Sequence, residues 1–298
     1  MSFSQQVKKE LLETEYEKNC CERALFYGMC IFSKNFSSYE IMFQSENENC
    51  ALLYKTLLKR HCNVDSELKM SPKGRSFSIL IEDKTECKKI MGTFGHGDAG
   101  SLRINFSNFD CEDCRNSFLA GAFLSCGTVS SPEKDYHLEF SVSYMNLSKS
   151  LVTLLEEFEL SPKTSTRKGY NIVYFKDSKA IEDCLYIMGA ASSMFEMMNV
   201  EIIKDIRNKA NRTANCETAN IERTVKASYS HIEAISKIEK TKGLNYLKND
   251  LREMAVLRRD NPDASLAELA KLSGLSRSGV NHRLRKIVEA AQNIQETE

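Results

Sequence analysis

Residues Ala264 to Lys286 read ASLAELAKLSGLSRSGVNHRLRK, a pattern that predicts a helix, a three-residue turn and a second helix. Ser265 is a candidate N-cap, and Glu268 three residues later completes the signature of a capping box. Gly274 lies where the chain must turn sharply, in a left-handed backbone conformation that glycine tolerates. We therefore predict a helix-turn-helix, a motif whose second helix enters the major groove of DNA.

Apolar residues recur at helical spacing in both segments, as a small packed motif requires. In the second segment, Val280, Leu284 and Ile287 form the predicted buried stripe, and Ser276 is placed to cap the helix. In the first segment and the turn, the predicted inward side chains are Leu266, Leu269, Ala270, Leu272 and Leu275.

The outer faces of the second segment carry the predicted DNA contacts. Arg277 is suited to guanine and Asn281 to adenine, because their side chains match those base edges. Arg283, Arg285 and Lys286 are better suited to phosphates, which position a protein on the duplex without specifying sequence. The alternative is a solvated basic helix in a small structural subdomain. The predicted site comprises Ser276, Arg277, Ser278, Asn281, His282, Arg283, Arg285 and Lys286.

The overall charge conceals an uneven distribution. The 298 residues have a formal net charge of zero and 42% hydrophobic residues, enough for about two domains with packed cores. Residues 201–298 carry 18 Lys or Arg against 14 Asp or Glu, whereas residues 1–200 carry 23 against 27. This asymmetry suits a protein whose contact with DNA is confined to its C-terminal part.

The N-terminal segment, Met1 to Leu12, is charged and amphipathic, so it does not resemble a signal peptide. No apolar run approaches the roughly 18 residues that span a bilayer. We therefore expect a cytoplasmic, nucleoid-associated protein without a membrane partner. Its 11 cysteines are then expected to be mostly reduced thiols.

An internal repeat organises the front half. Arg23 to Ser37 aligns with Arg115 to Val129 at an offset of 92 residues, and each segment carries small residues that allow close helix packing. The elements predicted to follow also correspond in order. They are strands at 39–44 and 136–142, helices at 49–60 and 146–158, strands at 76–82 and 170–176, and helices at 85–92 and 179–189. We therefore predict a duplicated unit that folds as two pseudo-symmetric halves, the alternative being a coincidence between two ordinary hydrophobic helices.

Residues Leu119 to Gly127, LAGAFLSCG, resemble the signature helix of LAGLIDADG homing endonucleases. The resemblance implies two such helices packed together, each with a carboxylate at its C-terminal end for a metal-dependent active site. Lys34 and Cys126 stand at the positions that we align with those acids. Lysine repels Mg²⁺ and a protonated thiol is a poor ligand for it, although Glu133 and Asp135 lie nearby. We expect no catalytic residues and no enzyme activity.

Three stretches together resemble the WhiA family of transcription regulators. They are SFSQQVKKEL (Ser2 to Leu11), RNKANRTANCETANIERTVKAS (Arg207 to Ser228) and NPDASLAELAKLSGLSRSGVNHRLRKI (Asn261 to Ile287). The resemblance implies an α+β fold, in which a duplicated αββαββα scaffold is followed by an all-α helix-turn-helix bundle. The predicted domains are an N-terminal helix (1–18), the endonuclease-like domain (19–198, with repeats at about 20–95 and 112–198), a basic linker helix (199–220) and the DNA-binding domain (221–298).

The linker region is rich in basic and amide side chains, which suit contacts with the sugar-phosphate backbone. A polar helix that only covers the second repeat is an equal alternative, and helices at 221–239 and 249–259 are expected to support the helix-turn-helix. The candidate secondary DNA contacts are Arg207, Lys209, Arg212 and Asn215.

Two pairs of cysteines occupy similar places in the two repeats, Cys20 with Cys21 and Cys111 with Cys114. If the signature helices pack side by side, the four sulfurs could converge as a zinc or redox site. One CxxC pair is a weak zinc signal, so we favour free thiols and expect no metal and no cofactor.

Together, these observations predict a sequence-specific regulator that binds double-stranded DNA. The family resemblance implies roles in cell division, chromosome segregation and sporulation. One alternative is a nucleoid-associated or division adaptor whose N-terminal domain binds another transcription or division protein. A working endonuclease is the other alternative, which Lys34 and Cys126 argue against.

Overall fold

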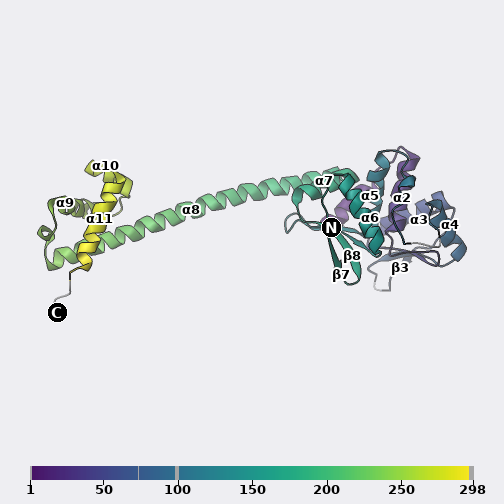
Figure 1. The fold of residues 1–298 in the computed structure, drawn as a ribbon, viewed down its shortest axis with the longest axis horizontal. Helices are drawn as coiled ribbons and strands as arrows, with labels where there is room; N and C mark the ends of the chain where they lie inside the picture. Colours follow the sequence, from purple (N-terminus) through teal and green to yellow (C-terminus); the bar gives the residue numbers. More distant parts are fainter. Residues whose placement is uncertain (1, 73, 98–100, 295–298) are drawn as a thin grey trace. The chain divides into compact units, whose positions relative to one another are not determined.

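The computed structural model describes residues 2–72, 74–97 and 101–294, which divide into two compact units between Lys204 and Asp205 (Figure 1). The last four residues of the predicted C-terminal domain lie outside the described residues. In the part of the chain that the structure describes, no helix is long and apolar enough to cross a membrane.

The first unit begins with helix α1, Phe3–Leu12, which Ser2 caps by accepting a hydrogen bond from the backbone N–H of Gln5. Two successive αββαββα repeats follow, as the sequence predicted. The first consists of α2 (Asn19–Ile31), β1 (Asn35–Phe36), β2 (Ile41–Ser45), α3 (Glu48–Cys62), β3 (Lys69–Met70), β4 (Phe77–Ile81) and α4 (Lys84–Thr93). The second, after the short helix η1 (Phe106–Asn108), consists of α5 (Asp113–Cys126), β5 (Gly127–Val129), β6 (Leu138–Val142), α6 (Met145–Glu157), β7 (Lys163–Arg167), β8 (Tyr170–Phe175) and α7 (Ser178–Met188).

Each repeat forms its own antiparallel sheet with the same strand order. The orders are β1-β2-β4-β3 and β5-β6-β8-β7, so the second repeat reproduces the topology of the first. In β2, alternate residues are buried and partly exposed, which places one face of the sheet against the helices. Helices α2 and α5 lie side by side in the core that the two repeats share (Figure 1).

Two glycines allow the backbones of α2 and α5 to approach closely. A Cβ atom added to Gly28 would lie 2.2 Å from the carbonyl oxygen of Phe118, and one added to Gly121 would lie 2.0 Å from that of Leu25. Both distances are far shorter than a van der Waals contact. The helix pair therefore requires glycine at these two positions.

These contacts correct the alignment of the repeats by one residue. Gly28 and Gly121 make reciprocal contacts with Phe118 and Leu25, so equivalent residues in the two helices are 93 positions apart rather than 92. The strands agree, because Phe36 pairs with Ile41 in the way that Val129 pairs with Leu138. The residue equivalent to Cys126 is therefore Ser33, and our assignment of Lys34 to that position was wrong.

Helix α8 runs without interruption from Ala191 to Thr241, so it begins in the first unit and ends in the second. The separate helices predicted at 199–220 and 221–239 are parts of this one helix, and no glycine or proline occurs between its ends to break it. The second unit continues with η2 (Leu244–Tyr246), α9 (Asn249–Asp260), α10 (Leu266–Ser273) and α11 (Arg277–Gln292). Residues of α8, α9, α10 and α11 share one hydrophobic core.

Candidate nucleic-acid interface and the ends of the helix pair

Helix α10 begins and ends, and helix α11 begins, at residues that the sequence marked, whereas α11 continues to Gln292. The Ser265 Oγ accepts a hydrogen bond of 3.2 Å from the Glu268 backbone N–H, and the Glu268 carboxylate accepts one of 2.7 Å from the Ser265 N–H. Gly274 ends α10 with a φ of +69°, in the left-handed region. The Ser276 Oγ accepts a 3.2 Å hydrogen bond from the Gly279 N–H and so caps α11. The predicted helix-turn-helix geometry is confirmed.

The buried side of α11 is the predicted stripe. Val280, Leu284 and Ile287 are fully buried, and Leu269 of α10 packs in the same core. The inward placement of Leu272 was wrong, because its side chain is 60% exposed. At 100° per residue, Leu266, Leu269 and Ala270 share one side of α10, whereas Leu272 lies about 100° from the centre of that side.

The opposite side of α11 faces solvent. Arg277, Asn281, His282, Arg285 and Lys286 are exposed, as is Ser278. In the described residues, no ion pair involves Arg277, Arg285 or Lys286. These cations are therefore available to an anionic partner such as a phosphate backbone.

Arg283 differs from the other basic residues of α11. It is half-buried, and its Nε lies 3.9 Å from Oδ2 of Asp250 in α9. Its side chain thus lies against another helix of the same unit, with part of its charge offset by a carboxylate. This contact makes Arg283 a weaker candidate for phosphate binding than Arg285.

A buried arginine that the sequence analysis missed supports the start of α10. Arg258 of α9 is only 1% exposed, and its Nη1 donates hydrogen bonds to the carbonyl oxygens of Asn261, Pro262 and Ala264, the last at 2.6 Å. Buried guanidinium groups need such acceptors, because an unpaired buried charge is costly. Arg258 therefore fixes the loop that leads into the helix-turn-helix. An arginine in the last turn of α9, three residues before Asn261 and Pro262, was the available sequence signal.

His231 of α8 is buried near Arg258. Burial, together with the positive charge of Arg258, lowers the pKa of its imidazole to about 4. The ring is therefore neutral at pH 7. Among the described residues of this unit, Arg258 is the buried cation, and its charge disfavours protonation of His231.

A groove in the second unit adjoins the start of α11. It is lined by Arg223 and Thr224 of α8, by Ser265 and Leu266 of α10, and by Arg277. Arg258 also lines it, so three arginines and the N-termini of two helices meet in one hollow, an arrangement that favours an anion.

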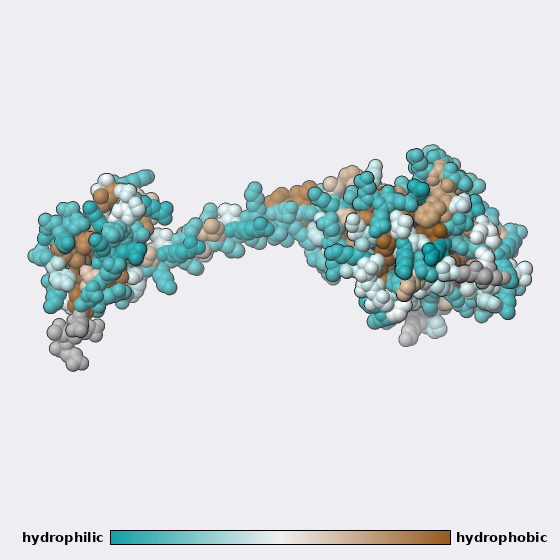
Figure 2. Space-filling view, in the orientation of Figure 1, coloured by the Kyte–Doolittle hydropathy of each residue, from teal (hydrophilic) through white to brown (hydrophobic). Residues whose placement is uncertain are grey.

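The candidate secondary contacts on α8 are also exposed. Arg207, Lys209, Arg212 and Asn215 are spread over about 200° of the helix at 100° per residue, so they form no single stripe. Apolar residues just before them in α8 are exposed as well, namely Ile202 at 55%, Ile203 at 54% and Ile206 at 65%. Figure 2 shows hydrophobic side chains in brown along α8.

Ser33 and Cys126 are the equivalent residues at the C-terminal ends of α2 and α5, where LAGLIDADG signature helices carry their acids. Neither residue is a carboxylate. The hydroxyl of buried Ser33 donates to the carbonyl oxygens of Cys30 and Asn35, at 2.7 and 3.0 Å. Burial raises the pKa of the Cys126 thiol to about 12, so the group stays protonated. Neighbouring Lys34 is exposed and donates a 3.2 Å hydrogen bond to the side chain of Gln44.

A lysine from α1 reaches this end of the helix pair. The Lys8 Nζ donates a 3.3 Å hydrogen bond to the Leu124 carbonyl oxygen, and its charge acts on the Cys126 thiol. Burial lowers the pKa of Lys8. Glu133 and Asp135 are exposed. Among the described residues, neither belongs to a group of three or more side chains arranged to hold a metal ion; the four such side chains that gather are Cys20, Cys21, Cys111 and Cys114.

Comparisons with known proteins agree with both units. Residues 210–291 match a family model described as the WhiA C-terminal HTH domain, and residues 115–207 match one described as the WhiA LAGLIDADG-like domain. The chain is similar to proteins named probable cell division protein WhiA. One, from Caldicellulosiruptor saccharolyticus, is 36% identical over 99% of this chain and 96% of its own length, and one from Clostridium botulinum is 35% identical over 99% of both. The crystal structure of full-length DUF199/WhiA from Thermatoga maritima covers 100% of both chains with a TM-score of 0.59 at 23% identity, which supports the fold.

Proposed function

Since this chain belongs to the WhiA family, we propose that it is a sequence-specific DNA-binding transcription regulator that acts in cell division. The observation that carries the proposal is the outer face of α11, where exposed basic and amide side chains lie opposite a buried apolar stripe. The proposal includes the roles in chromosome segregation and sporulation that the family resemblance implies.

The side chains of α11 are expected to have different roles, because they point in different directions and lie at different distances from the N-terminus of the helix. At 100° per residue, His282 lies almost opposite the buried stripe, with Ser278 and Lys286 on either side of it. Arg277 and Asn281 are one turn apart near the N-terminus, where a recognition helix meets base edges. We assign base reading to Arg277 and Asn281 and phosphate contacts to Arg285 and Lys286.

The arginine groove supports a phosphate contact at the start of the motif. A phosphate held by Arg223 in this groove would also face the N-termini of α10 and α11. We therefore expect Arg223 to contribute to affinity for every duplex and not to base preference. The dispersed residues Arg207, Lys209, Arg212 and Asn215 are proposed as secondary backbone contacts of lesser effect.

Selection of bound duplexes from a random pool by the full-length chain tests this proposal. We expect a short motif to be enriched by the unaltered protein, and Asn281→Ala to lose the preference at one base pair. Asn293→Ala, just beyond the C-terminus of α11, is the control and should enrich the unaltered motif. Selection of no motif at low and moderate salt would contradict sequence-specific binding.

The first unit is proposed to lack nuclease activity. Two-metal hydrolysis needs carboxylates that hold cations at the attacking and leaving oxygens. The equivalent residues here are Ser33 and the protonated thiol Cys126, with the ammonium group of Lys8 beside them. Incubation of the full chain with its selected duplex and Mg²⁺ or Mn²⁺ should leave the DNA intact. Cleavage that is lost on adding a chelator would overturn this part of the proposal.

The acidic balance of residues 1–200 favours a further candidate role, in which the first unit binds a basic protein partner. The chain would then act as a nucleoid-associated or division adaptor. Genome-wide binding distinguishes the two roles, because a regulator gives a few sharp peaks whereas an adaptor with diffuse affinity does not.

A further inference from the structure

Four cysteines meet where the paired helices of the first unit begin. Cys20 and Cys21 occupy the first turn of α2, Cys111 lies just before α5, and Cys114 lies in its first turn. Their four sulfur atoms all lie within 4.8 Å of one another. The Cys111 sulfur is central, at 3.7 Å from that of Cys20 and 3.5 Å from those of both Cys21 and Cys114.

The pseudo-symmetry of the repeats explains why the sulfurs converge. Cys21 and Cys114 are 93 residues apart, the same offset that relates the contact glycines Gly28 and Gly121. These two cysteines are therefore equivalent residues in helices that pack side by side. Cys20 and Cys111 add one sulfur from each repeat, so each repeat supplies two ligands.

The sulfur spacing matches one tetrahedral metal ion. A zinc ion with Zn–S bonds of about 2.3 Å holds its sulfurs about 3.8 Å apart. A disulfide would require about 2.05 Å, much less than the distances here. A cluster of several irons would place iron and sulfide between the cysteines and hold their sulfurs farther apart than this group allows.

The surroundings suit a thiolate site that is closed on one side. Cys21 and Cys114 are buried, whereas Cys20 and Cys111 are partly exposed and leave a path for a metal ion to enter. The N-terminus of α2 and that of α5 both adjoin the group, and their helix dipoles favour negative charge. The ammonium group of Lys18 is close enough to interact electrostatically with Cys111 and Cys21, and it also forms a 2.8 Å ion pair with Asp113.

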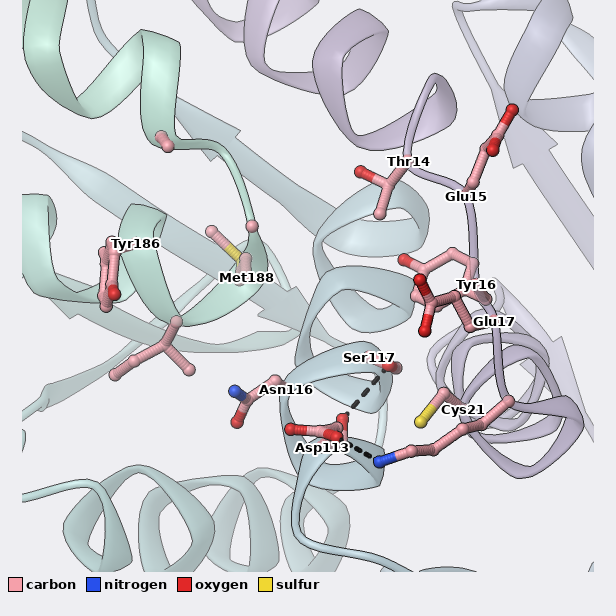
Figure 3. A pocket seen from close by; sticks show the side chains of 14 residues that line it. Thr14, Glu15, Tyr16, Glu17, Cys21, Asp113, Asn116, Ser117, Tyr186 and Met188 are labelled. Atoms are coloured by element: carbon pink, nitrogen blue, oxygen red, sulfur yellow. Dashed lines mark hydrogen bonds and ion pairs between the residues drawn. The ribbon is translucent and has the colours of Figure 1, made fainter.

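Figure 3 shows a pocket that borders this group at Cys21. Cys21 of α2 and Asp113 of α5 face the same hollow, which is also lined by Tyr16 and Ser117. The Lys18–Asp113 ion pair connects the two helices at this end, independently of the sulfurs.

We propose that Cys20, Cys21, Cys111 and Cys114 bind one structural zinc ion that joins the beginnings of α2 and α5. Binding would displace the thiol protons to solvent, up to four per Zn²⁺, and form four Zn–S bonds with no change of oxidation state. The site would lie at the end of the helix pair opposite to the end where endonucleases of this fold hold their catalytic metal. The zinc ion would link the two repeats. The zinc proposal does not depend on the proposed DNA binding by α11.

Elemental analysis of the full-length chain tests the proposal directly. Protein purified with a reductant and without chelators is expected to contain about one zinc per chain. Replacing zinc with Co²⁺ should give the visible absorption spectrum of a tetrahedral tetrathiolate site. Iron in place of zinc, or fully reduced protein with no bound metal after exposure to Zn²⁺, would overturn the proposal.

Cysteine variants locate the metal. Cys20→Ser and Cys111→Ser should lose bound zinc to the level found after chelation, whereas Cys216→Ser, at an exposed position of α8, should retain it. Zinc retained by both cluster variants would place the ion elsewhere and contradict the assignment. If a variant does not fold, removing zinc from the unaltered chain with a chelator must still lower the unfolding temperature of the first unit. An unchanged unfolding temperature would contradict the structural role.

Discussion

The outer face of α11, where we propose DNA recognition, and the C-terminal ends of α2 and α5 differ in how their positive charges are partnered. On α11, Arg285 and Lys286 are exposed and have no ion-pair partner among the described residues. At the helix-pair ends, Lys8 is hydrogen-bonded to a backbone carbonyl and Lys34 to Gln44. Among the described residues, Arg285 and Lys286 donate no side-chain hydrogen bond, whereas both lysines at the helix-pair ends donate to a neighbouring oxygen. A chain of zero formal charge can therefore present a locally basic face.

The largest expected effect is a loss of stability in the first unit, where α2 and α5 pack closely. Gly121→Ala should lower the free energy of unfolding of the first unit by about 3 kcal/mol or more, because its Cβ would lie 2.0 Å from the Leu25 carbonyl oxygen. Chemical denaturation followed by circular dichroism measures this change. Gly92→Ala is the matched control, since nothing lies within 4 Å of its added Cβ and α4 is a helix. Equal stability of the two variants would contradict the close packing of α2 and α5.

Arg258→Ala should weaken the second unit by about 3 kcal/mol, because three backbone carbonyls would lose their buried partner. DNA affinity should fall with it, since the loop before α10 would no longer be fixed. Thermal unfolding and DNA titration measure the two effects. Neighbouring Arg259→Ala should cost less than about 1 kcal/mol, because its ion pair with Glu239 is exposed. A similar loss from both variants would argue against a positioning role for Arg258.

Two substitutions on α11 distinguish base reading from phosphate contact. Arg277→Ala should cost about 2 kcal/mol on the selected site and much less on unrelated DNA, because it removes a base contact. Arg285→Ala should weaken binding to all duplexes alike and reduce the magnitude of the salt slope by about 1. Fluorescence anisotropy over a range of salt concentrations measures both. Identical, sequence-independent losses would contradict the assigned roles.

The smallest expected effect is a pH dependence confined to the second unit. The pKa of His231 is lowered to about 4 in the folded chain, from about 6.5 when unfolded. The unfolded state therefore binds the proton more tightly, and stability should fall as pH decreases from about 6.5 towards 4. The loss between pH 7 and pH 5 should be about 1–2 kcal/mol and should be smaller in His231→Gln. Equal pH profiles for the two proteins would show that His231 is not the group responsible.

Local signals in the sequence identified most of the elements. The capping box of Ser265 and Glu268, the turn at Gly274 and the stripe of Val280, Leu284 and Ile287 depend on neighbours within one or two turns, and all are confirmed. Hydrophobic periodicity, which is local, also identified the helices of the repeats and the strands β2, β4, β6 and β8. The other strand of each pair was implied only by the family resemblance.

What the sequence did not reveal depends on contacts between distant segments. The offset of 93 is visible only when the backbone of Gly28 meets that of Phe118, so Lys34 was aligned with Cys126 in place of Ser33. Arg258 is buried because a loop folds back over it, which no periodicity encodes. The four cysteines were favoured as free thiols, because only the packing of α2 against α5 brings their sulfurs together.

Photocrosslinking tests the central comparison most directly. A photoreactive phenylalanine analogue can replace His282 on α11 or Lys34 at the end of α2, since both side chains are exposed. Each full-length protein is then irradiated with the selected duplex at moderate salt. We expect the analogue at position 282 to crosslink to DNA and the analogue at position 34 to give little or no product. Efficient crosslinking at position 34 with none at position 282 would contradict the assignment of DNA recognition to α11.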